Sequence, residues 1–452
     1  MTPPTNQPVR SVFASVQLAL LLLFLLAATS IIGTIIPQNN PPSFYIEKYG
    51  AQTARLFQLL DITDMYNSWW FLALLTLFAV NLVVCSLERI PGVIRTIRRD
   101  GLETAPDQLD RQPCRQAVDL AAPVAEASQR AATLLRAHGW KPREAATADG
   151  RLLFAERGPW TRFGVYVVHL SILIILAGAL VGSSTVASRL LRNPDFAFKG
   201  SVMLPEQEST GHILAFKSGR RIDLGFSLRC DAFAIEYYDN GMPKTYRSSV
   251  TVLEDGKPVR TAEIEVNRPL THRGVTFYQS SYQAGREYVV SLEKRPDNLT
   301  RTAVVPPARE VAWPEAGVRY GIVNRENQGE VTRRLKIWFD DGQGEPALFW
   351  MPAGGETTLE RPSGTYRLQA RQLYATGLQA TKDPGVWLVY GGCLLMLIGL
   401  YIAFFLSHRR VWVRVEPTAE GSRLLFAGTA NKNRLAFEKK FAALVNDLDT
   451  HR

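Results

Sequence analysis

The sequence is poor in cysteine, with four in 452 residues, and it contains no Cys-x-x-Cys pair. That absence excludes a thioredoxin-type redox centre and a zinc ribbon, because both need paired thiolates at that spacing. Walker A and Gly-x-Gly-x-x-Gly patterns are also missing, which removes the usual nucleotide-binding signatures. The sequence therefore shows no catalytic motif of its own.

Charge is absent from four long stretches. No Lys, Arg, Asp or Glu occurs in residues 11–46, 67–87, 163–187 or 384–408. A helix needs roughly 20 apolar residues to cross about 30 Å of hydrocarbon. The sequence therefore predicts a polytopic α-helical membrane protein with four transmembrane helices, at 11–33, 68–87, 163–183 and 384–406. The first is expected to stay as a span, because no small-x-small cleavage site follows its leucines.

Basic residues predict the orientation of these spans. Arginines cluster directly after the second span, before the third and after the fourth, and such clusters face the cytoplasm under the positive-inside rule. The rule predicts a cytoplasmic N-terminus (1–10), loop (88–162) and C-terminal tail (407–452). The loop 34–67 and the long segment 184–383 then lie outside. The net charge of +10 therefore needs no nucleic-acid partner.

The segment 184–383 is predicted to form a large β-rich extracytoplasmic domain. Asp239-Asn240-Gly241 and Asp255-Gly256 are strong hairpin signals, because Asn-Gly and Asp-Gly accept the positive φ that tight turns need. The expected strands are 226–238, 246–253, 288–294, 334–339 and 366–373. On the cytoplasmic side, alternation and helical periodicity predict helices at 124–138 and 434–448, a strand at 150–156 and a hairpin at 412–426.

Five of the six histidines have ordinary interpretations. His138 ends a predicted helix before a glycine, and His212 and His272 fall in expected turns. His408 follows the last span and is expected in the headgroup region. His451 lies near the end of the chain.

His169 is different, because it lies six residues beyond Phe163 and so about 9 Å into the third span. No other acidic or basic side chain occurs in the four apolar cores, tyrosines aside. Polar groups at such depth are costly and usually face a partner or a ligand, and a neutral imidazole is a frequent axial ligand of haem iron. Two interpretations stay open from position alone: a haem ligand, or a histidine hydrogen-bonded to a neighbouring helix.

Other polar features suggest packing. Asn81 is expected to hydrogen-bond across helices, and Gly178 and Gly182 form a small-xxx-small spacing typical of helix contacts. Trp69-Trp70 is typical of an interfacial aromatic belt. The run 277–282, rich in aromatic and polar residues, either lines a binding surface or reflects strand alternation, which we favour.

Several strings resemble the ResB/CcsB family of System II cytochrome c biogenesis proteins. They are Gly33-Thr34-Ile35-Ile36-Pro37-Gln38, the segment 81–91 (NLVVCSLERIP), the third span with His169, the segment 269–282, and Asp383-Pro384-Gly385 with Ser407 to Trp412. The resemblance runs in order through essentially the whole chain.

The resemblance implies a role in attaching haem covalently to c-type cytochromes. The membrane would be a bacterial inner membrane, with the large domain in the periplasm, or a thylakoid. Family members work with a CcsA-type membrane protein that carries a tryptophan-rich WWD segment. No such segment occurs here, so the partner should be a separate chain. Haem b, shared with that partner, is the implied cofactor, and the family's haem-ligating histidine maps onto His169.

Further expected partners are apocytochrome c and a thioredoxin-like thiol reductant system. The chain would then be a subunit of a cytochrome c synthase (haem lyase) complex without catalytic residues of its own. The alternative is a scaffold or apocytochrome chaperone in the same complex that does not bind haem. A receptor is disfavoured by the lack of kinase, cyclase or helix-turn-helix motifs. A secondary transporter is disfavoured because neither broken helices nor paired repeats are visible.

Overall fold

The computed structural model describes residues 12–216, 218–238 and 242–450. The chain divides into two compact units. The first comprises residues 1–180 and 385–452, and the second comprises residues 181–384. Each unit has hydrophobic clusters of its own.

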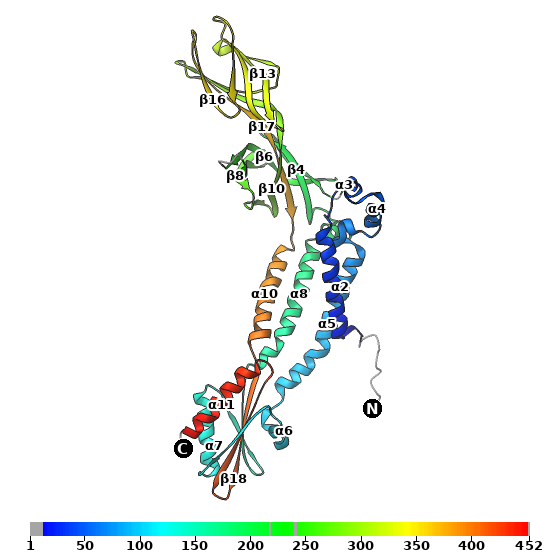
Figure 1. Ribbon diagram of the computed structural model, residues 1–452, viewed down its shortest axis with the longest axis vertical. Coiled ribbons are helices and arrows are strands. Elements are labelled where there is room, and N and C mark those ends of the chain that lie inside the picture. Colours follow the sequence, from blue (N-terminus) through cyan, green and yellow to red (C-terminus); the bar gives the residue numbers. More distant parts are fainter. Residues whose placement is uncertain (1–11, 217, 239–241, 451–452) are drawn as a thin grey trace. The chain divides into compact units, whose positions relative to one another are not determined.

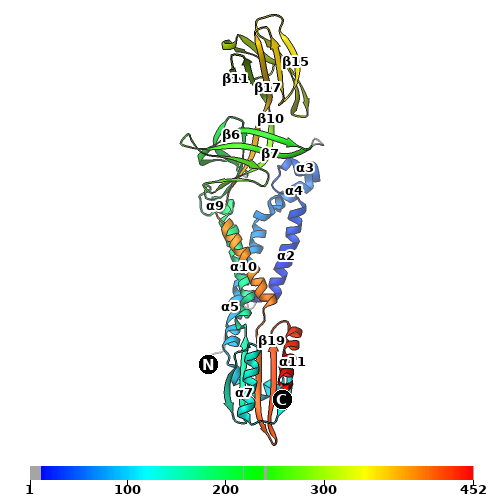
Figure 2. The ribbon, with the colours of Figure 1, turned by 90° about the vertical axis from the view of Figure 1, so that its left-hand side faces the viewer.

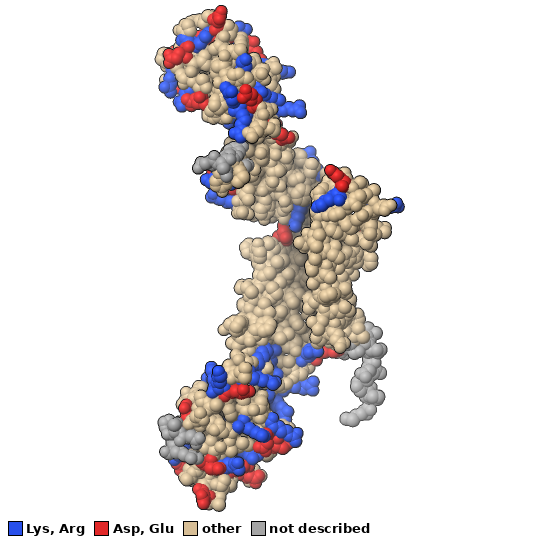
Figure 3. All heavy atoms as spheres, in the orientation of Figure 1, with Lys and Arg blue, Asp and Glu red and all other residues tan. Residues whose placement is uncertain are grey.

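Four long helices in the described chain are apolar enough to cross a membrane, which confirms the predicted spans. They are α2 (Val16–Ile35), α5 (Trp69–Arg98), α8 (Gly164–Val181) and α10 (Val386–Phe405). In the first unit their surface forms a band without charge, and Lys and Arg gather at one end of it (Figure 3). Helix α5 has 30 residues and continues beyond the predicted end of the second span at residue 87.

The helices pack as two visible pairs, α2 with α5 and α8 with α10 (Figure 1). Glycines allow the second pair to approach closely. A Cβ added at Gly399 would lie 2.9 Å from the Val168 side chain, and one at Gly178 would lie 2.9 Å from Val389. Small residues at such contacts let helix backbones meet, which confirms the packing role predicted for Gly178. Gly182 instead lies against the carboxylate of Asp383.

Asn81 joins α5 to the chain that leads into α2. Its side chain is fully buried, and its Nδ2 donates to the carbonyl oxygens of Phe13 at 2.7 Å and Ser15 at 3.2 Å. The Ser15 hydroxyl accepts the backbone N–H of Gln17 and so caps α2. The predicted interhelical hydrogen bond of Asn81 is confirmed, and its function is to position the start of α2.

Three short helices connect α2 to α5, namely α3 (Pro42–Tyr49), α4 (Ala51–Leu59) and η1 (Ile62–Asn67). Gln38 holds this connection together. Its Nε2 donates to the carbonyl oxygens of Ile36 and Ile62, and its Oε1 accepts the backbone N–H of Met65. The string 33–38 therefore has a structural role.

A small α+β domain combines residues 99–158 with residues 407–450, and we call it the split domain. Its antiparallel sheet has the order β1-β19-β18-β3-β2. Helices α7 and α11 lie alongside this sheet (Figure 2) and share a core with it. The strands are β1 (Cys114–Leu120), β2 (Arg143–Thr147), β3 (Gly150–Arg157), β18 (Arg409–Thr418) and β19 (Gly421–Ala430), and the helices are α6 (Pro106–Asp110), α7 (Val124–Ala137) and α11 (Arg434–Thr450).

Each local element predicted for this region is confirmed, but their association into one domain was not predicted. Trp412 shows how closely the two segments are joined. Its side chain is buried, and its Nε1 donates to the carbonyl oxygen of Gly101 at 2.8 Å, 311 residues away in sequence.

The second unit is β-rich, as predicted. A ten-stranded sheet has the order β11-β10-β17-β4-β5-β6-β7-β8, with β16 paired to β17 and β9 to β10, and a four-stranded sheet has the order β12-β13-β14-β15. The elements are α9 (Ser184–Arg189), β4 (Phe198–Pro205), β5 (Ser209–Ala215), β6 (Arg221–Tyr237), β7 (Pro243–Glu254), β8 (Lys257–Glu265), β9 (Leu270–His272), β10 (Val275–Arg295), β11 (Leu299–Val305), β12 (Glu310–Trp313), β13 (Val318–Gln328), β14 (Val331–Asp340), β15 (Ala347–Pro352), β16 (Glu356–Arg361) and β17 (Gly364–Lys382).

Two long strands, β10 and β17, contribute to both cores of this unit. On β10, Phe277 is fully buried whereas Tyr278 is 43% exposed, so the run 277–282 begins with the strand alternation that we favoured. The predicted Asp255-Gly256 hairpin is also confirmed, with φ of 50° and 77° at the two turn residues. The other predicted turn, 239–241, lies outside the described residues.

An ion pair between Arg371 and the fully buried side chain of Glu206 joins strands of the second unit. The Glu206 carboxylate accepts hydrogen bonds from the Arg371 guanidinium at 2.8 Å and from the backbone N–H of Phe233 and Tyr374. Cys230 lies nearby, and burial together with the negative charge of Glu206 raises the pKa of its thiol to about 12. Such a thiol stays protonated and unreactive in the native fold.

Candidate functional site

His169 lies on α8 and faces α5. The imidazole is partly buried, and its Nδ1 lies 2.9 Å from the Ser86 hydroxyl oxygen. The same hydroxyl lies 2.6 Å from the carbonyl oxygen of Leu82. A carbonyl can only accept, so the single hydroxyl proton of Ser86 is donated to Leu82.

This geometry selects the tautomer of the neutral His169 ring. Because the Ser86 proton is used by Leu82, the hydroxyl must accept from His169, and the hydrogen of the neutral imidazole is on Nδ1. The other ring nitrogen, Nε2, then carries a lone pair. In the part of the chain that the structure describes, Nε2 has no hydrogen-bond partner.

A histidine that ligates a metal commonly has this arrangement. Its unligated nitrogen usually donates to an acceptor that fixes the ring orientation and the tautomer. Ser86 is such an acceptor for His169. The donor set therefore fits one axial position of a haem iron, for which a neutral imidazole is a common ligand.

Exposed apolar side chains occur close in sequence to His169 and Ser86. They are Val165 and Leu170 on α8 and Val83 and Leu87 on α5. The Tyr166 ring meets the imidazole edge-on, with ring centroids 6.0 Å apart. A porphyrin is a flat apolar plate with an anionic edge, so these apolar side chains suit its faces.

The sequence left two interpretations of His169 open, a haem ligand or a histidine hydrogen-bonded to a neighbouring helix, and the structure is compatible with both. The hydrogen bond to a neighbouring helix exists, and it uses one of the two ring nitrogens. The second nitrogen remains available to a ligand. Sequence reasoning missed Ser86, because pairing it with His169 requires knowing which faces of α5 and α8 meet.

His408 has protein partners that the sequence did not suggest. It is buried, with 2% of its surface exposed. The Nε of Arg162 donates to its Nδ1 at 2.8 Å, and its own Nε2 donates to Glu156 at 2.9 Å. Burial lowers the pKa of His408, and the positive charges of Arg162 and Arg410 act in the same direction, against the opposing effect of Glu156. Both ring nitrogens are occupied, so His408 is a structural residue.

Two further described histidines form ion pairs with carboxylates. His138 pairs with Asp447 at 2.8 Å, and His272 with Glu254 at 3.0 Å. The expected turns were wrong, because His212 lies within β5 and His272 is the last residue of β9. His451 lies outside the described residues. Among the described residues, no group of three or more His, Cys, Asp or Glu side chains is arranged to hold a metal ion.

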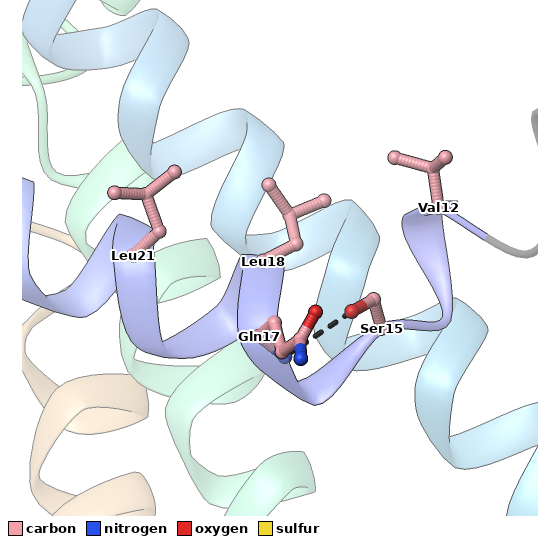
Figure 4. A pocket seen from close by; sticks show the side chains of 5 residues that line it. All are labelled: Val12, Ser15, Gln17, Leu18 and Leu21. Carbon is pink, nitrogen blue, oxygen red and sulfur yellow. Dashed lines mark hydrogen bonds between the residues drawn. The ribbon is translucent and has the colours of Figure 1, made fainter.

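A shallow hollow on the first unit lies at the start of α2 (Figure 4). It is lined by Val12, Ser15, Gln17, Leu18 and Leu21. The Ser15 hydroxyl in it accepts the backbone N–H of Gln17, which is the helix cap already described. None of these side chains is a strong metal ligand, so the hollow is no alternative to His169.

Comparison with known proteins identifies the family. Residues 16–313 and 339–442 match the ResB-like family. The chain belongs to this family. The matched residues include both partners of the hydrogen bond between Ser86 and His169, and most of the second unit.

Full-length relatives of this ResB-like chain are each named cytochrome c biogenesis protein CcsB. The protein from Gloeobacter violaceus is 30% identical over 462 residues, which cover 97% of this chain and 90% of the relative. One from a Synechococcus strain is 29% identical, covering 96% and 90%. The one from Thermosynechococcus vestitus is 27% identical, covering 98% and 97%. The similarity therefore extends through both units.

Proposed function

We propose that this ResB-like membrane protein functions in cytochrome c biogenesis, with His169 as an axial ligand to haem on its way across the membrane. The observation that carries the proposal is the Ser86–His169 hydrogen bond, which leaves the Nε2 lone pair of the neutral imidazole available. The family and the names of its full-length relatives support the biological setting.

The residues of this chain have distinct functions in the proposal. Haem b is the cargo, and its iron accepts the Nε2 lone pair of His169. Ser86 holds the ring in the required tautomer and orientation. The exposed apolar side chains of α5 and α8 contact the porphyrin face. A CcsA-type partner supplies the second axial histidine and the outer site to which the haem passes.

The second unit is proposed to hold or orient apocytochrome c outside the cytoplasm. The positive-inside rule supports this side, because basic residues concentrate next to the split domain. The membrane is a bacterial inner membrane or, as in the cyanobacterial setting of the relatives, a thylakoid. Cys230 is the only cysteine of this unit and is buried. A separate thioredoxin-like system would therefore keep the apocytochrome thiols reduced.

The direct test is the haem content and visible spectrum of the full-length protein, purified with its partner. We expect the wild type to carry six-coordinate haem and His169→Ala to lose it. His212→Ala is the matched control, because that histidine lies in the second unit. If His169→Ala keeps the wild-type spectrum, the haem ligands belong wholly to the partner, and the chain is a scaffold or apocytochrome chaperone.

A further inference from the structure

Two polar side chains lie on the same side of His169. Arg89 is three residues after Ser86 on α5, and Tyr166 is three residues before His169 on α8. Helix α5 runs toward the split domain and α8 runs away from it. Both residues are therefore displaced from the Ser86–His169 hydrogen bond in the same direction, by about 4.5 Å along each helix axis.

Several arginines at this end of the helices are held by hydrogen bonds within the first unit. Arg162 donates to His408, Arg95 donates to its own helix at the carbonyl oxygen of Pro91, and Arg99 donates to Gln108. Arg89 is exposed and has no hydrogen bond or ion pair with any described residue.

Arg89 is therefore an unpaired cation close to exposed apolar side chains and to the available Nε2 of His169. Haem has matching chemistry, with an iron at its centre, apolar faces, and two propionate carboxylates on one edge. A guanidinium binds a carboxylate through two parallel N–H groups, which fixes direction as well as affinity.

We propose that Arg89, assisted by the Tyr166 hydroxyl, binds a haem propionate and so sets the orientation of haem about the His169–iron axis. The propionate edge then faces the split domain, and the opposite edge, which carries the vinyl groups, faces the other side of the membrane. This inference rests on the proposed ligation by His169, and it adds a second residue that recognises the cargo.

The test compares two porphyrins in the full-length protein reconstituted in nanodiscs. Ferric haem b and its dimethyl ester, in which both propionates are neutral, are titrated and followed by the Soret band. We expect the wild type to bind haem b at least tenfold more tightly than the ester. Arg89→Gln should reduce this preference to about twofold or less, with the same Soret position. Arg89→Lys, which keeps the charge, should restore part of the preference.

Arg98→Gln is the matched control, because it removes an exposed arginine from the same helix nine residues further along. It should keep the wild-type preference. Tyr166→Phe should lower the preference less than Arg89→Gln does. If Arg89→Gln retains the full preference for haem b, the proposal is overturned while ligation by His169 stands. If His169→Ala binds each porphyrin with the same affinity as the wild type, His169 is not a haem ligand. The proposed function then fails, and the proposed haem orientation fails with it.

Discussion

His169 and His408 both lie in the first unit, and both contact a neighbouring element through a ring nitrogen, but they differ in what remains available. His408 is buried between Arg162 and Glu156 and uses both nitrogens. His169 is only partly buried and uses Nδ1 alone, on Ser86. The comparison teaches that a structural histidine uses both ring nitrogens on protein partners, whereas one that can take a ligand keeps a nitrogen available.

The largest expected effect is a loss of haem in the His169→Ala variant that does not occur in His408→Ala. His169→Ala should lower the haem content of the purified complex to background, because it removes the imidazole nitrogen that is proposed to bind the iron. Its stability should change little, since one hydrogen bond contributes about 1 kcal/mol. His408→Ala should keep the haem content per folded molecule. Equal haem loss in both variants would contradict the assignment of His169 as the ligand and His408 as a structural residue.

The next effect concerns the stability of the split domain. His408→Ala leaves Glu156 and the Arg162 guanidinium without a shared partner, which should cost about 3 kcal/mol. Hydrogen–deuterium exchange in β18 should then become about a hundredfold faster. His138→Ala is the control, because its pair with Asp447 is more exposed and should contribute less than about 1 kcal/mol. Equal exchange rates in the two variants would contradict the structural function of His408.

A smaller effect is expected from the residue that orients the His169 ring. Ser86→Ala removes the acceptor of the Nδ1 hydrogen, and loss of such a partner typically costs about tenfold or more in metal affinity. The measurement is haem titration of the full-length protein. Ser171→Ala is the control, because the Ser171 hydroxyl donates only to the Val168 carbonyl oxygen of its own helix. If both serine variants bind haem like the wild type, Ser86 does not prepare the ring.

The smallest effect is a pH dependence of stability that belongs to His408. Its lowered pKa means that the native ring stays neutral at pH values where the unfolded chain takes up a proton, which begins near pH 6.5. Stability should therefore fall as the pH decreases from about 7 toward the folded pKa. Thermal unfolding at pH 7.5 and 5.5 should show a larger loss for the wild type than for His408→Gln. The same loss in both proteins would mean that other groups carry the dependence.

The features that sequence predicted well are those decided locally. Four uncharged stretches determine four spanning helices, because the length and apolar character of each segment suffice. The Asp255-Gly256 turn depends on two residues that accept positive φ. The helix 124–138 and the hairpin 412–426 were likewise visible in periodicity alone.

The features that sequence could not predict depend on pairings between distant segments. The split domain joins two segments separated by two spans and the whole second unit, so no local pattern links β3 to β18. His408 looked like a headgroup residue, because Arg162 and Glu156 lie 246 and 252 positions away. His169 was identified from depth alone. Its tautomer required Ser86, whose position relative to α8 only the folded helices define.

The central claim is that Nε2 of His169 is an axial ligand to haem, and a cavity variant tests it most directly. In His169→Gly the ring is removed and space is left beside Ser86, so added imidazole can occupy the position of the lost side chain. Visible spectra of the full-length complex, recorded with and without imidazole, give the answer. The account predicts that six-coordinate haem disappears in His169→Gly and returns with imidazole. A wild-type spectrum in the variant without imidazole would contradict it.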